Sequence, residues 1–135
     1  MRWALFLIGA LAAAQTPDDV VGFLRSTASA LADAHGGGAL GTNDARAFLE
    51  CFDSSMPRFA DLRDEIETLV ERAAVGSAVE IVSDEGDAAK RKLELDWVLE
   101  IQDQRPRRAI LKVTIEKRKK DWKITALEPV EFFKY

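Results

Sequence analysis

The first half of the chain carries its apolar residues at helical spacing. Helices are predicted over residues 16–34, about 43–56 and 61–74. The first opens with Pro17 and two acids, which is typical of a first helical turn, and Pro57 breaks the second. In each helix the apolar positions form one stripe, and charged residues occupy the other side. The pattern therefore predicts three amphipathic helices.

The second half changes to a period of two. Strands are predicted over residues 78–83, 92–101, 109–116 and from residue 122 onward, with turns between them. One face of this meander is almost wholly apolar, and these are its predicted inward positions: Leu93, Leu95, Trp97, Leu99, Ile101, Ala109, Leu111, Val113, Ile115, Trp122, Ile124 and Ala126. An antiparallel sheet with one buried face needs a cover. The fold class is therefore predicted as α+β, with three N-terminal helices packed on a four-stranded antiparallel sheet.

Ahead of the first predicted helix lies an apolar stretch. Residues 3–14 are uncharged, follow Arg2 and end in three alanines, which is the pattern of a secretory leader. A permanent anchor needs about 20 apolar residues, and a lipoprotein leader needs a cysteine at this point. A buried core helix is the remaining alternative. We predict a signal peptide over 1–14, a single domain over 15–135, and export to the periplasm or the extracellular space.

The composition is consistent with one globular domain. The 135 residues are 47% hydrophobic and 31% charged, enough for one domain with a real core and a charged surface. The formal net charge of −4 argues against a nucleic-acid ligand, because phosphate binding rests on a basic surface. The single cysteine, Cys51, cannot form an internal disulfide, and we interpret it as a small apolar residue on a helix face, with a reactive or intermolecular thiol as the alternative.

Charged residues fall outside the predicted apolar face of the sheet. Asp96 is interpreted as an exposed acid that pairs across strands with Lys112 or Lys123, and Asp53 as a cap or loop acid. No catalytic residue is therefore predicted. The alternative is an enzyme of the isomerase or hydrolase type that uses Asp53 or Asp96, because acid–base catalysis needs an ionisable group held in a desolvated site.

Neither a cofactor nor a metal is predicted. His35 is the only histidine, and a zinc site needs several histidine or cysteine ligands. The acids of residues 84–87 favour a plain turn over a weak calcium site. The run over 116–120, with four consecutive cations, favours a solvated turn over contact with an anionic lipid or an acidic partner.

Two segments resemble a known superfamily: DARAFLECFDSSMPRFADLRDEIETL over residues 44–69, and the closing strand DWKITALEPVEFF over 121–133. Both are similar to the nuclear transport factor 2-like (cystatin-like cone) superfamily. The resemblance implies a sheet curled into a cone-type roll whose open end holds a small-molecule pocket. Some members are isomerases, dehydratases or hydrolases, and many have lost catalysis and act as binding or interaction modules.

The sequence therefore favours an exported, non-enzymatic domain that binds a small apolar ligand or a protein partner in or beside the cone. A structural subunit that dimerises through the sheet is a further alternative, and we expect a monomer or weak dimer. The predicted ligand-binding residues are Phe52, Phe59, Trp97, Val113, Trp122 and Phe132.

Overall fold

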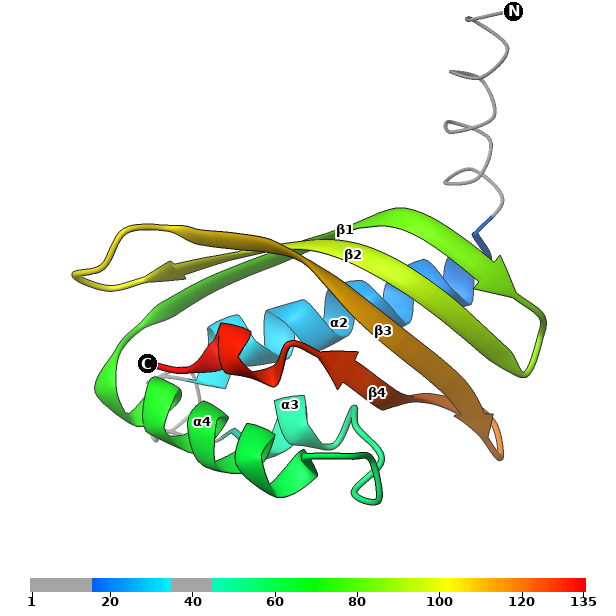
Figure 1. Ribbon diagram of the computed structural model, residues 1–135, viewed down its shortest axis with the longest axis horizontal. Helices are drawn as coiled ribbons and strands as arrows, with labels where there is room; N and C mark the ends of the chain where they lie inside the picture. Colours follow the sequence, from blue (N-terminus) through cyan, green and yellow to red (C-terminus); the bar gives the residue numbers. More distant parts are fainter. Residues whose placement is uncertain (1–15, 35–44) are drawn as a thin grey trace, which may run out of the picture.

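The computed structural model describes residues 16–34 and 45–135. The predicted leader and His35 lie outside these ranges. Within them the chain forms helices followed by strands, so the predicted α+β class is confirmed (Figure 1). The elements are α2 (Asp18–Ala34), α3 (Arg46–Leu49), α4 (Phe59–Arg72), β1 (Val75–Gly86), β2 (Lys90–Ile101), β3 (Arg107–Arg118), β4 (Asp121–Glu128) and the 3₁₀ turn η1 (Val130–Phe133).

The strands form one antiparallel sheet in the order β1-β2-β3-β4, and the helices lie together along its concave side (Figure 1). Alternation places every second side chain of β2 in the core, as the period of two predicts. In β4 the alternation breaks, because the register with β3 shifts between Thr114 and Ile115. After this bulge Leu127 is buried, and Ala126, which the pattern places inward, is only half-buried.

The second predicted helix is wrong beyond a single turn. The helix α3 ends at Leu49, and the chain then runs beside β4, where Phe52 forms a parallel bridge with Ile124. The Ile124 amide donates to the Cys51 carbonyl at 2.8 Å, and the Asp53 amide donates to the Ile124 carbonyl at 2.8 Å. These bonds satisfy backbone groups on the outer edge of β4 that would otherwise lack partners, which favours an extended segment over a longer helix.

An aromatic cluster fills the space between sheet and helices. Phe48, Phe52, Trp97 and Phe133 are at most 4% exposed. The rings of Trp97 and Phe133 meet edge to face at 5.2 Å between centroids, and those of Phe48 and Phe52 lie 5.0 Å apart. The Trp97 indole donates to the Ser77 hydroxyl at 2.9 Å. The middle of the curved sheet is therefore a packed core.

A buried ion pair joins the start of the domain to the sheet. The Asp84 carboxylate, 2% exposed, accepts hydrogen bonds from Arg91 Nε at 2.9 Å, from Arg91 Nη2 at 3.0 Å and from the Thr16 hydroxyl at 2.9 Å. The turn predicted over residues 84–87 is wrong, because β1 continues to Gly86. A Cβ on Gly86 would lie 2.3 Å from the Lys90 carbonyl oxygen, so this position needs glycine.

The C-terminal turn η1 packs on α4 beside a carboxyl group that is poorly solvated. Glu131 pairs with Arg58, and Arg107 donates to the Phe132 carbonyl at 2.6 Å. Glu65 of α4 is half-buried, and its Oε2 atom is buried without a hydrogen-bond partner. Burial raises the pKa of the Glu65 carboxyl above its ordinary value, and the nearby Glu131 raises it further.

We expect Glu65→Gln to stabilise the fold at neutral pH by up to about 1 kcal/mol, since the amide removes a poorly solvated charge. The folded-state pKa of Glu65 lies above its unfolded-state value, so the carboxyl destabilises the folded state at neutral pH and ceases to do so below both pKa values. The gain should therefore disappear below the ordinary value of 4.5. Urea unfolding of the wild type and the variant, from neutral pH to below 4.5, measures this difference in stability. A difference that grows as the pH falls would contradict the raised pKa of Glu65.

Candidate functional site

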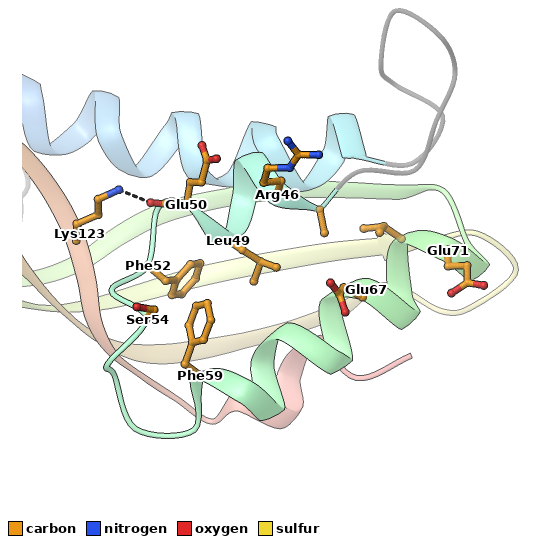
Figure 2. A pocket seen from close by; sticks show the side chains of 11 residues that line it. Arg46, Leu49, Glu50, Phe52, Ser54, Phe59, Glu67, Glu71 and Lys123 are labelled. Atoms are coloured by element: carbon orange, nitrogen blue, oxygen red, sulfur yellow. Dashed lines mark hydrogen bonds between the residues drawn. The ribbon is translucent and has the colours of Figure 1, made fainter.

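An open groove lies between the 45–54 segment, α4 and the edge of β4. Its volume is about 860 Å³. Figure 2 shows Leu49, Phe52 and Phe59 facing one another across it, with Glu67 projecting from α4 toward the same hollow. The full lining is Ala45, Arg46, Leu49, Glu50, Phe52, Ser54, Phe59, Glu67, Val70, Glu71 and Lys123.

The apolar floor of the groove follows from local structure. Leu49 is the last residue of α3, and the bridge with Ile124 holds Phe52 beside it. On the opposite wall Phe59 opens α4 and Val70 follows three turns later, which places both on the same helical face. Leu49 and Phe59 are half-buried, so they present apolar surface that the core does not cover. An apolar floor of this kind suits an apolar guest.

Charged groups form the rim. The Lys123 ammonium donates to the backbone carbonyl of Glu50, which ties β4 to the loop after α3 (Figure 2). Glu67 and Glu71 stand one turn apart on α4 and are exposed. Neither has an ion-pair partner among the described residues. The α4 wall of the groove is therefore acidic.

A second hollow, of about 850 Å³, touches all four strands and the start of α4. Its lining includes one row of polar residues that crosses all four strands. In this row Glu94 lies opposite Ser83 on one side and Lys112 on the other, and Lys112 lies opposite Glu128. The Ser83 hydroxyl also donates to the Glu94 carboxylate at 2.8 Å. Apolar residues, among them Leu93, Val113 and Leu127, line this hollow as well.

Comparison with solved structures shows a similar fold. A crystal structure of a protein of unknown function with a cystatin-like fold from Nostoc punctiforme aligns with a TM-score of 0.58 over 81% of this chain and 85% of that chain, at 11% sequence identity. The chain has a cystatin-like fold. No protein-family profile matches the sequence, and the search of curated proteins finds no similar one. The likeness shows the fold alone.

The cystatin-like fold distributes the six predicted ligand-binding residues over three places. Phe52 and Phe59 meet in the groove, and Val113 lines the second hollow. The other three line neither hollow and are buried in the core: Trp97 is 1%, Trp122 7% and Phe132 6% exposed. Phe52 and Val113 are equally buried, at 4% and 2% exposed. The sequence analysis did not identify Leu49 of α3 and Val70 of α4, which line opposite sides of the groove. Their apolar neighbours Phe52 and Phe59 were the one available signal in the sequence. The two sides of the groove come together through the bridge between Phe52 and Ile124 of β4, which the local sequence does not indicate.

Asp53 lies outside the linings of the groove and of the second hollow. Its carboxylate accepts hydrogen bonds from the Ser55 hydroxyl at 2.6 Å and the Ser55 amide at 2.8 Å, and it pairs with Arg118 Nε at 3.1 Å. The Ser55 hydroxyl, then the Ser55 amide and Arg118, lower the pKa of the Asp53 carboxyl to about 2. A carboxylate stabilised in this way is a poor proton acceptor at neutral pH.

Asp96 is likewise held as an anion. Arg108 Nε and Nη2 donate to its two oxygens at 2.9 and 2.5 Å. This hydrogen bonding lowers the pKa of the Asp96 carboxyl. The predicted pairing with Lys112 or Lys123 is wrong, because Lys112 stands opposite Glu94 and Lys123 opposite Glu116.

The remaining candidate groups are engaged within the described chain. Cys51 is half-buried, and its thiol lies 3.5 Å from the Ala47 carbonyl oxygen. Asp87 accepts two backbone amides of the β1–β2 turn, from Ala89 and Lys90. Over residues 16–34 and 45–135, no group of three or more histidine, cysteine, aspartate or glutamate residues is arranged to hold a metal ion.

Two of the cations in the 116–120 run have acidic partners. Lys117 lies 3.6 Å from Asp19 and above the Trp122 ring, and Arg118 pairs with both Asp53 and Glu116. None of the helices described in the structure is long and apolar enough to cross a membrane.

Proposed function

We propose that this chain is a non-catalytic binding module that holds an apolar group of a ligand or partner in the groove between α3 and α4. The observation that carries the proposal is that Leu49 and Phe59, both half-buried, leave apolar surface exposed beside the buried Phe52 in a concave site of about 860 Å³. A small domain that keeps such a surface uncovered gains no folding free energy from it, and a guest would remove it from water.

The enzyme alternative has less support. Acid–base catalysis needs a group whose pKa lies near the working pH and which faces a site. Asp53 and Asp96, the two candidate carboxylates, have lowered pKa values and lie outside the linings of the groove and of the second hollow. A reaction that used either would first have to displace an arginine.

Two wider proposals accompany this function. The apolar stretch over residues 3–14 supports export with removal of the leader. The segments over 44–69 and 121–133, together with the cystatin-like fold, support membership of the nuclear transport factor 2-like superfamily. In that setting the domain would act as a binding module outside the cytoplasm.

Binding of the neutral, environment-sensitive dye N-phenylnaphthylamine tests the function. We expect its fluorescence to rise on the folded chain and Leu49→Gln to weaken its affinity about fivefold, because the variant loses part of the hydrophobic contact of a leucine side chain. Ile110→Gln is the matched control, since Ile110 is 49% exposed and lies outside the groove lining. Equal affinity for both variants, or no binding by the folded chain, would contradict the proposal.

A further inference from the structure

We infer that the guest of the groove is a segment of a partner protein that combines an apolar side chain with lysine or arginine, in other words a basic amphipathic segment. The inference rests on the proposed function and names the partner class for the same groove. It is carried by the charge pattern of the α4 wall, by the direction in which the groove's own cations point, and by the length of the groove.

The α4 wall carries two acids, Glu67 and Glu71, that form no ion pair with any residue the structure describes. Glu67 and Glu71 are an i, i+4 pair of like charges, which slightly destabilises a helix. Glu71 also lies in the last turn of α4, where the helix dipole disfavours an acid. By contrast, Asp61 and Asp64 on the same helix pair with Arg58 and Arg63. A cation brought by a guest would remove this unfavourable arrangement.

The cations of the groove do not fill that role. The Lys123 ammonium is held at the Glu50 carbonyl, on the β4 side. Figure 2 shows Arg46 directed away from Phe52 and Phe59. The lining therefore holds three acids and two bases, and among the described residues neither Glu67 nor Glu71 forms an ion pair with a base. This charge distribution complements a basic guest and disfavours an acidic one.

The shape of the groove favours a protein segment over a compact small molecule. Its α4 wall runs from Phe59 to Glu71, a helical rise of ~18 Å. A segment lying along this wall could place an apolar side chain at the Phe59 end and a basic one near Glu71. The apolar contact would supply affinity, and the pairing with Glu67 and Glu71 would set orientation.

Labelled synthetic peptides provide the test. The first peptide carries leucine and lysine at helical spacing, and two matched peptides carry glutamine or glutamate in place of lysine. By fluorescence anisotropy we expect the full chain to bind the lysine peptide about fivefold to tenfold tighter than the glutamine peptide, as two exposed ion pairs allow. The glutamate peptide should bind weakest, and added salt should reduce the preference for lysine.

The variant that decides the assignment is Glu67→Gln/Glu71→Gln, which should lose the preference for the lysine peptide over the glutamine peptide. Glu80→Gln/Glu100→Gln is the matched control, because it removes the same charge at exposed positions outside the groove lining. A preference for lysine that survives in the first variant, or equal binding of all three peptides, would overturn the inference. If the dye binds and the preference is absent, the proposed function stands without this partner. If the dye also fails to bind, both fall.

Discussion

Replacing Trp97 with alanine is expected to lower the free energy of unfolding by about 3–5 kcal/mol, the usual cost of removing a large buried aromatic. The indole is 1% exposed and meets both Phe48 and Phe133 edge to face. Its loss would leave a cavity between the sheet and the helices that rigid strands cannot close. The Ser77 hydroxyl would also lose the indole N–H as a donor. A domain of this size has a total stability of similar order, so much of the variant could unfold.

Chemical denaturation followed by circular dichroism measures this cost. Trp97→Phe is the graded comparison, because it keeps a ring in the cluster and removes the hydrogen bond to Ser77. It should lose about half as much stability as the alanine variant. A loss below about 1 kcal/mol for Trp97→Ala would show that the middle of the sheet is not the packed core described above.

Replacing Asp84 with asparagine should cost about 3–5 kcal/mol, because it leaves the Arg91 guanidinium buried without its counter-charge. Both groups are largely withdrawn from water, with side-chain exposures of 2% for Asp84 and 13% for Arg91. The same carboxylate accepts the Thr16 hydroxyl, so the loss would also loosen the start of α2 from the β1–β2 end of the sheet.

The double variant Asp84→Asn/Arg91→Met separates the ion pair from general packing. Removing both charges at once should recover much of the stability lost by Asp84→Asn, since no uncompensated charge remains buried. Thermal unfolding of the wild type, the two single variants and the double variant completes the cycle. Strictly additive losses would contradict the buried pair.

The fold could be predicted where one physical pattern dominated. In β2 the alternation of Leu93, Leu95 and Trp97 with charged residues fixes which face is buried, because a slip of one residue would expose every large side chain. The short α3 could not be predicted in the same way. Phe48 and Phe52 have helical spacing, yet Phe52 belongs to the edge of the sheet. A backbone bridge to Ile124, far along the chain, determines the position of Phe52. The spacing of apolar residues around Phe52 does not indicate this pairing.

The candidate site was predictable only in part for the same reason. Phe52 and Phe59 were predicted as aromatic ligand-binding residues, and both line the groove. Trp97 was expected at a pocket because the resemblance implied an open cone, but the aromatic rings around it occupy that space. In the sequence, Glu67 and Glu71 are typical of the solvent-exposed face of an amphipathic helix. Only the packing of α4 opposite Leu49 turns it into one side of a groove.

A guest bound between α3 and α4 should change the environment of the residues that line the groove. Backbone amide chemical shifts of the nitrogen-labelled chain, recorded as N-phenylnaphthylamine is added, locate the bound dye. We expect the largest changes on Leu49, Phe52, Phe59 and Val70, with little change at the second hollow around Lys112 and Val113. Largest changes at that second hollow, or changes spread evenly over the domain, would contradict binding in the groove.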